Sequence, residues 1–194
     1  MVEFEILSST PFTRSDLQVI YRPGRGLHLS DEATRHIDRT WKRHLENYNR
    51  DGLPVFDGSL FRLTDYSLDK GAPVIELADT TYREYVGTAT EDFYGVYPEA
   101  WTANPLAVCI ALVTGDGKIL IERRTTLTRY RAPYHVIGGF MERGKDCSEG
   151  TPDPFLAITR EVREELGLVL ARQSVGEQGQ VDVPVDLHLP GFSV

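Results

Sequence analysis

The sequence predicts a mixed α/β fold of the α+β class, and three observations support this. One amphipathic pattern with the helical period starts at Asp31, and a second starts at Pro154. Between them, short apolar or alternating stretches bounded by turn residues have the length of β-strands. With 194 residues, the chain can bury one substantial core or two small ones.

Composition limits the classes of function. The formal net charge of −8 and the lack of a basic run argue against a nucleic-acid partner. No apolar stretch reaches the ~20 residues of a membrane span, and the acidic N-terminus lacks a signal-peptide pattern. Two cysteines do not form a disulfide framework, and Cys109, in an apolar run, is expected to be a small core residue. We therefore expect a cytoplasmic protein without a membrane partner.

Residues 1–101 are expected to form an N-terminal α+β module. Weak alternation over residues 1–26 predicts two short strands and a turn at 23–26. A helix follows from Asp31, and its pattern ends at 49–52. Its apolar residues recur every four positions and are Ala33, Ile37, Trp41 and Leu45. Trp41 is expected in the core rather than against a ligand.

Strand patterns fill the rest of this module. The expected strands are residues 60–63, 74–77 and 81–85, with a turn at 69–71 between the first two. Tyr82, Arg83 and Tyr85 can stack on and hydrogen-bond a nucleobase, or they can pack on a sheet, which is the favoured interpretation. Residues 90–101, rich in aromatic and acidic side chains, are expected to be a linker or a lid.

A second domain is expected over residues 102–194. It opens with a β-hairpin, in which an apolar strand over 106–113 is followed by a Gly-Asp-Gly turn and a return over 118–124. Four cations then precede a glycine pair: Arg123, Arg124, Arg129 and Arg131. They suit a diphosphate, or they pair with neighbouring glutamates. Near the end, residues 180–189 alternate as one strand, on which His188 is a solvent-facing residue or an acid–base group.

The most sharply bounded element is a helix over residues 154–166. Asp153 suits the N-cap, Pro154 the first helical position, and Gly167 the residue just past the end. One apolar stripe is formed by Phe155, Ile158, Val162 and Leu166.

Three carboxylates lie beside this stripe: Glu161, Glu164 and Glu165. Like charges at these spacings repel each other, and the helix C-terminus disfavours anions. Arg160 can pair with Glu164, but no basic residue lies at a helical spacing from the other two. The helix either presents a charged face to solvent or binds a divalent cation, Mg²⁺ or Mn²⁺, which prefers carboxylate oxygens.

Together, Gly138-Gly139 and the acidic helix resemble the signature of the Nudix hydrolases. In this signature, called the Nudix box, a glycine is followed after five residues by a glutamate. Seven residues later comes the segment Arg-Glu-apolar-x-Glu-Glu-x-Gly-apolar. Gly139 and residues 160–168 match its two ends, whereas Lys145 replaces the first glutamate and residues 147–154 include an insertion. In the family, that glutamate holds the box arginine. Glu142, Asp146 or Glu149 would have to replace it here, and metal affinity or turnover is expected below the family norm.

Features outside the box are similar to the Nudix branch that cleaves UDP-glucose and UDP-galactose. They are the Trp41 helix, residues 61–63, 81–83 with 87–88, 104–106, and Arg123-Arg124 before the glycine pair. The resemblance covers about residues 38–168 and implies an N-terminal module that packs on an α/β/α Nudix sandwich. Nudix domains continue beyond the box (138–168 here) with more strands and usually a helix, so the C-terminal part is expected to be short.

The resemblance also implies roles for individual residues. Implied metal ligands are Glu161, Glu164, Glu165 and the Gly138 carbonyl. Arg160 would orient the helix, and Glu161 is the expected general base. Expected substrate-binding residues are Arg123, Arg124, Tyr82 and Arg83.

The expected activity is Mg²⁺-dependent hydrolysis of a nucleoside diphosphate-linked substrate, with a UDP-sugar giving UMP and a hexose 1-phosphate. ADP-ribose or another nucleoside diphosphate is an alternative substrate. A non-catalytic nucleotide-sugar binder or scaffold is an alternative of a different class. Family members often dimerise, so a homodimer is a further expectation.

Overall fold

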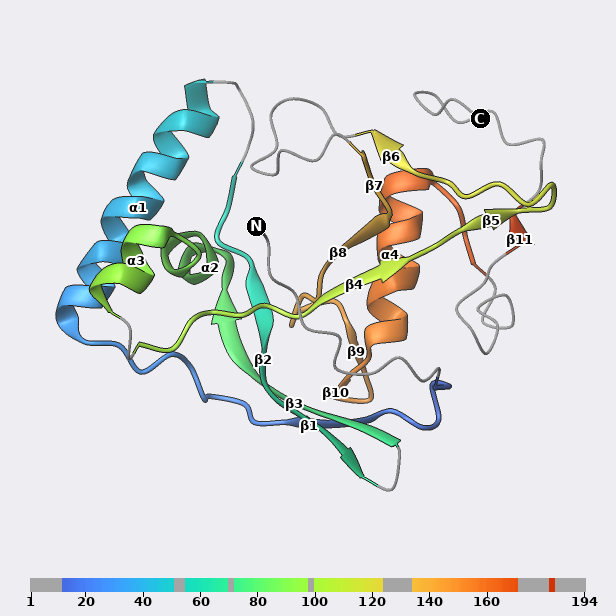
Figure 1. The fold of residues 1–194 in the computed structure, drawn as a ribbon, viewed down its shortest axis with the longest axis horizontal. Coiled ribbons are helices and arrows are strands. Elements are labelled where there is room, and N and C mark those ends of the chain that lie inside the picture. The colour runs from blue at the N-terminus through green and yellow to red at the C-terminus, as the bar shows by residue number, and fades with distance from the viewer. Residues whose placement is uncertain are drawn as a thin grey trace.

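The computed structural model describes residues 12–50, 55–69, 72–97, 100–123, 134–170 and 182–183 (Figure 1). Its helices are α1 (Asp31–Arg50), α2 (Tyr82–Thr88), α3 (Glu91–Val96) and α4 (Pro154–Leu166). Its strands are β1 (Gln18–Tyr21), β2 (Ser59–Asp69), β3 (Ala72–Thr81), β4 (Ala107–Ile110), β5 (Val113–Thr114), β6 (Glu122–Arg123), β7 (Tyr134–His135), β8 (Ile137–Phe140), β9 (Cys147–Ser148), β10 (Thr151–Pro152) and β11 (Asp182–Val183). The architecture is mixed α/β with small sheets, which confirms the predicted class.

A three-stranded sheet forms the base of the N-terminal half. β3 lies in the middle, parallel to β1 and antiparallel to β2. The strands predicted around Val19, Leu60 and Val74 are therefore confirmed. The other predicted strand of residues 1–26 and most of the 69–71 turn lie outside the described residues.

The strand predicted over residues 81–85 is wrong, because this segment begins helix α2. Thr81 is the N-cap, and its hydroxyl accepts a hydrogen bond from the Glu84 amide at 3.2 Å. In return, the Glu84 carboxylate accepts from the Thr81 amide at 3.0 Å. This Thr-x-x-Glu capping box satisfies two helix N-terminal donors and overrides the strand-like aromatic alternation.

The segment predicted as a linker or lid contains a further helix, α3, with Thr90 as its N-cap. Phe93 and Tyr97 are buried against Ala33 and Ile37 of α1. In Figure 1, α1, α2 and α3 accordingly stand together on one side of the molecule. Trp41 is half-buried, stacks on the ring of His44 and contacts Tyr82 edge-on.

Phe61 joins the two halves of the chain. Its amide donates to the Met141 carbonyl at 3.1 Å, and its carbonyl accepts from the Leu106 amide at 2.8 Å. Its side chain is fully buried in a cluster with Ile75, Leu77, Met141 and Ala157. This core draws on residues from both sides of the expected boundary between 101 and 102, and the division into two domains stays a prediction.

The predicted hairpin over residues 106–124 is confirmed only near its turn. The Thr114 amide donates to the Lys118 carbonyl at 2.8 Å, and the Leu120 amide to the Leu112 carbonyl at 2.9 Å. β4 instead pairs antiparallel with β8 along its length. Cys109 is exposed rather than buried, because α4 covers one face of β4 and the strand period turns Cys109 to the other.

After α4, the structure describes residues 167–170 and then β11, which pairs parallel to β5. The remainder of the predicted 180–189 strand, with His188, lies outside the described residues. Within the described ranges, no helix combines the length and apolar character required to cross a bilayer.

Candidate functional site

Helix α4 has the limits that its sequence predicts. The Asp153 carboxylate accepts hydrogen bonds from the amides of Phe155 and Leu156 at 3.0 and 3.2 Å. Gly167 ends the helix at a φ of +69°, a left-handed conformation that glycine adopts readily. Ile158, Val162 and Leu166 are buried against β4 and β8. This packing fixes which face of α4 its charged residues occupy.

Arg160 is a buried cation held on two edges of its guanidinium. Its Nε donates to Asp146 Oδ1 at 2.8 Å and its Nη2 to Asp146 Oδ2 at 2.7 Å. Nη2 also donates to the Phe140 carbonyl at 3.1 Å. Hydrogen bonding to the Asp146 carboxylate is the main reason that the pKa of Arg160 is raised above its usual value. Of the three residues proposed to replace the box glutamate, Asp146 accepts the hydrogen bonds of Arg160, and Glu142 lies at ion-pair distance from it.

The insertion before α4 places Asp146 and the helix start side by side. After Asp146 the chain forms a short hairpin, β9 and β10, with Glu149 and Gly150 at its turn. Both turn residues have positive φ, +52° and +80°, as a two-residue hairpin loop requires. The Asp153 amide then donates to the Asp146 carbonyl at 2.9 Å. The extra residues therefore close on themselves and return the chain to the helix N-cap.

Three carboxylates converge on the third edge of the guanidinium. Arg160 Nη1 lies 2.8 Å from Glu161 Oε1, 3.1 Å from Glu164 Oε2 and 3.8 Å from Glu142 Oε1. Helical spacing predicted the contact with Glu164 but not the one with the adjacent Glu161. Glu165 is exposed on the same helix.

Glu161 is the most buried of these carboxylates, with 9% of its surface exposed. Burial raises the pKa of Glu161, and Arg160 only partly offsets this effect. The charged carboxylate is thus held in a poorly solvated position, where a cation would stabilise it.

The glycine pair lies within strand β8. A Cβ on Gly138 would lie 2.2 Å from the Val108 carbonyl oxygen. A Cβ on Gly139 would lie 2.4 Å from Glu161 Oε1. Gly138 therefore permits the close pairing of β8 with β4, and Gly139 leaves room for the Glu161 carboxylate.

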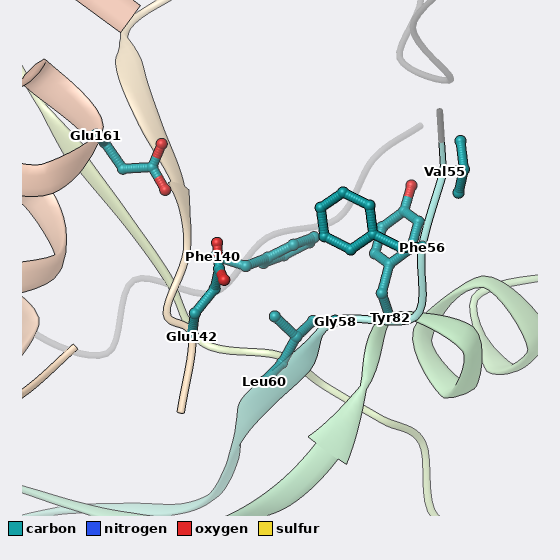
Figure 2. Close-up of a pocket in the computed structure, with 8 residues that line it drawn as sticks. All are labelled: Val55, Phe56, Gly58, Leu60, Tyr82, Phe140, Glu142 and Glu161. Carbon is teal, nitrogen blue, oxygen red and sulfur yellow. The ribbon is translucent and has the colours of Figure 1, made fainter. Parts of the chain in front are cut away.

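A pocket of about 310 Å³ opens beside these carboxylates (Figure 2). It is lined by Val55, Phe56, Gly58, Leu60, Tyr82, Phe140, Glu142 and Glu161. Figure 2 shows Glu161 and Glu142 at one end, Phe56 and Tyr82 at the other, and Phe140 between them. One end can therefore hold a cation with its anionic partner, and the other can hold a planar apolar group.

The expected substrate-binding residues are only partly brought to this pocket. Tyr82 lines it. Arg83 instead reaches α1, where its Nη2 lies 3.0 Å from Asp38 Oδ1. Arg123 is exposed on β6. Arg124, like Arg129 and Arg131, lies outside the described residues.

Sequence reasoning missed the two phenylalanines of the pocket. Phe56 precedes β2 in a segment without periodicity, so no pattern marks it. Phe140 directly follows the glycine pair, and this position is the only feature of the sequence that could have indicated its place in the pocket. The centroid of its ring lies 5.0 Å from that of the Tyr85 ring in α2, and this contact joins β8 to the N-terminal helices.

The chemistry of the donor set fits Mg²⁺ or Mn²⁺, because the carboxylates offer hard oxygen ligands. Within the described ranges, no three His, Cys, Asp or Glu side chains already surround a common point as ligands would. The carboxylate oxygens are directed to Arg160 Nη1 instead. A metal would therefore bind beside the guanidinium and share these carboxylates with it.

Comparison with known proteins does not assign a family. No family model matches the chain, and a search of curated proteins finds no match either.

Proposed function

We propose that the protein is a Nudix-type hydrolase that cleaves the pyrophosphate bond of a nucleoside diphosphate-linked substrate with the help of Mg²⁺ or Mn²⁺. The observation that carries this proposal is the pocket with two unlike ends, carboxylates around Arg160 at one and aromatic rings at the other. The Nudix-like ends of the box, at Gly139 and residues 160–168, fall on β8 and α4 beside this pocket.

Each charged residue then has a role that follows from its position. Glu161 and Glu164, with Glu165 and the Gly138 carbonyl, would hold the metal, and Glu142 adds a carboxylate beside them. When bound, the metal neutralises phosphate oxygens and lowers the pKa of a water. Arg160, fixed by Asp146, keeps Glu161 and Glu164 in place. Glu161 lines the pocket, and burial raises its pKa, which makes its carboxylate a stronger base toward a water.

The aromatic end suits the nucleobase. Phe56 has 75% of its surface exposed although it lines the pocket, so a ligand that stacked on it would cover apolar area. Stacking on aromatic rings tolerates any base, because every base has a π-face. The preference for a UDP-sugar therefore rests on the resemblance of the residues outside the box, and ADP-ribose is the main competing substrate.

The test is release of UMP from UDP-glucose, and of AMP from ADP-ribose, by the wild-type protein in millimolar Mg²⁺. Faster release from UDP-glucose supports the proposal in full. Faster release of AMP from ADP-ribose would support the proposed hydrolase activity and would make ADP-ribose, rather than a UDP-sugar, the preferred substrate. Folded protein that releases neither product contradicts the proposed activity.

A second function, a non-catalytic nucleotide-sugar binder, is favoured by one observation. Lys145 lies within ion-pair distance of Glu142 and Glu164 and so neutralises part of the charge that a metal needs. Binding of UDP-glucose without hydrolysis, unchanged by Glu164→Gln, would support this alternative. A homodimer and a cytoplasmic location remain predictions.

A further inference from the structure

Phe56 reaches the pocket from a segment that is bonded to the start of helix α2. The Tyr82 amide donates to the Gly58 carbonyl at 2.9 Å, and the Arg83 amide donates to Asp57 Oδ1 at 2.8 Å. Both amides belong to the first turn of α2, where backbone donors have no partner within the helix. The Asp57 side chain therefore satisfies a helix donor from the position next to Phe56.

The chain after Asp57 is held by its backbone. The Arg143 amide donates to the Ser59 carbonyl at 3.0 Å, and Leu60 forms a β-bridge with Glu142. These contacts, and the one at the residue 58 carbonyl, do not depend on the side chain at position 57. The aromatic ring on the other side of Asp57 is 75% exposed, so packing does little to fix its position.

We propose that Asp57 is a positioning residue, which holds Phe56 beside Tyr82 at the aromatic end of the pocket. Figure 2 shows both rings at this end. With the backbone of residue 57 fixed, the Phe56 side chain has fewer orientations to lose when a planar group stacks on it, and this lowers the entropic cost of binding. The effect on affinity rests on the proposed function, in which the planar group is a nucleobase, whereas the positioning itself does not.

Limited proteolysis with chymotrypsin tests the positioning without any ligand, because cleavage after Phe56 follows the population of the locally opened segment. Asp57→Ala loses one hydrogen bond and should be cleaved there about fivefold faster than wild type, as measured by mass spectrometry of the fragments. Asp57→Asn should be cleaved at the wild-type rate, because its amide oxygen can still accept from the Arg83 amide. Asp57→Glu displaces the carboxylate by one methylene, so it should also be cleaved faster, and it decides the matter if Asp57→Ala does not fold.

Calorimetric titration with UMP in Mg²⁺ tests the consequence for the site. Asp57→Ala should raise the Kd about fivefold, with no further effect in a Phe56→Ala background, because Asp57 acts through Phe56. Asp57→Asn should restore the wild-type Kd. The matched control is Asp38→Ala, which removes another exposed carboxylate that contacts Arg83, at 3.0 Å from its Nη2. It should change neither the cleavage nor the Kd.

Unchanged cleavage after Phe56 in Asp57→Ala, or an equal effect of Asp38→Ala, would overturn the inference. The same loss of UMP affinity in the wild-type and Phe56→Ala backgrounds would also overturn it, because Asp57 would then act by another route than Phe56. Faster cleavage combined with an unchanged Kd, or with no UMP binding by wild type, would support the positioning of Phe56 and contradict only the nucleobase site of the proposed function.

Discussion

The Asp146 carboxylate accepts two parallel hydrogen bonds from Arg160, at 2.8 Å from Nε and 2.7 Å from Nη2. Asp146 is fully buried, and its Oδ2 also accepts from the Glu142 amide at 2.7 Å. One carboxylate thus ties the turn after β8 to the middle of α4. Because the guanidinium is planar, fixing two of its nitrogens also fixes the direction of Nη1, on which the site carboxylates converge.

Asp146→Asn should destabilise the protein by about 3 kcal/mol, since it leaves a buried arginine without its main charge partner. The unfolding free energy measured in urea checks this value. Glu149→Gln is the matched control, because Glu149 is an exposed acid in the neighbouring hairpin. It should change stability by less than about 0.5 kcal/mol. Equal effects of the two variants would contradict the role given to Asp146.

The two adjacent glycines should respond differently to alanine. In Gly139→Ala, the new Cβ meets the movable end of Glu161, so the fold should survive while Glu161 is displaced. We expect a loss of turnover of about 100-fold with a nearly unchanged melting temperature. In Gly138→Ala, the Cβ meets the Val108 backbone, so the melting temperature should fall sharply. A similar loss of stability in both variants would show that Gly139 serves only strand pairing.

Glu161→Gln should stabilise the metal-free protein at neutral pH. The pKa of Glu161 is raised above 4.5 in the folded state, so the fold favours the neutral form. The associated stability is present below the unfolded-state pKa and is lost as the pH rises through the raised value. Wild type should therefore match the variant near pH 4 and fall below it by pH 7 when EDTA is present. Millimolar Mg²⁺ should restore the stability of wild type alone, and urea titrations across this range check both effects.

Phe56→Ala should weaken nucleotide binding without affecting the fold. Stacking of one base on an aromatic side chain contributes about 1–3 kcal/mol, and Phe56 is mostly exposed in the absence of ligand. Calorimetric titration with UMP measures the change in Kd. Leu68→Ala removes another exposed apolar side chain, near the far end of the β2–β3 hairpin, and should leave binding unchanged. Unaltered UMP affinity in Phe56→Ala would place the base elsewhere.

Helix limits and one face of α4 could be predicted because local chemistry determines them. Asp153, Pro154 and Gly167 each act within one turn of the helix end, and the apolar stripe requires only a period of 3.6. The segment after Thr81 was mispredicted because its aromatic residues alternate as in a strand, whereas the capping box of Thr81 and Glu84 favours a helix. The partner of β4 could not be predicted, since pairing with β8 joins residues about thirty positions apart.

The site was predictable only in part, for a related reason. Arg160 and Glu164 lie one helical turn apart, so their contact follows from spacing, whereas the contact of Arg160 with the adjacent Glu161 does not. The choice of Asp146 over Glu142 and Glu149 depends on how the insertion folds into β9 and β10, which no local rule determines. Phe56 reaches the pocket from the segment before β2 through tertiary packing alone.

The most direct test of the central claim is Mg²⁺-dependent release of UMP from UDP-glucose, with wild type and Glu164→Gln assayed side by side and with EDTA as the metal-free control. The carboxylate cluster predicts release by wild type in Mg²⁺, a loss of at least about tenfold in Glu164→Gln, and no release in EDTA. Equal rates for the two proteins, or release that persists in EDTA, would contradict the claim that these carboxylates bind a catalytic cation.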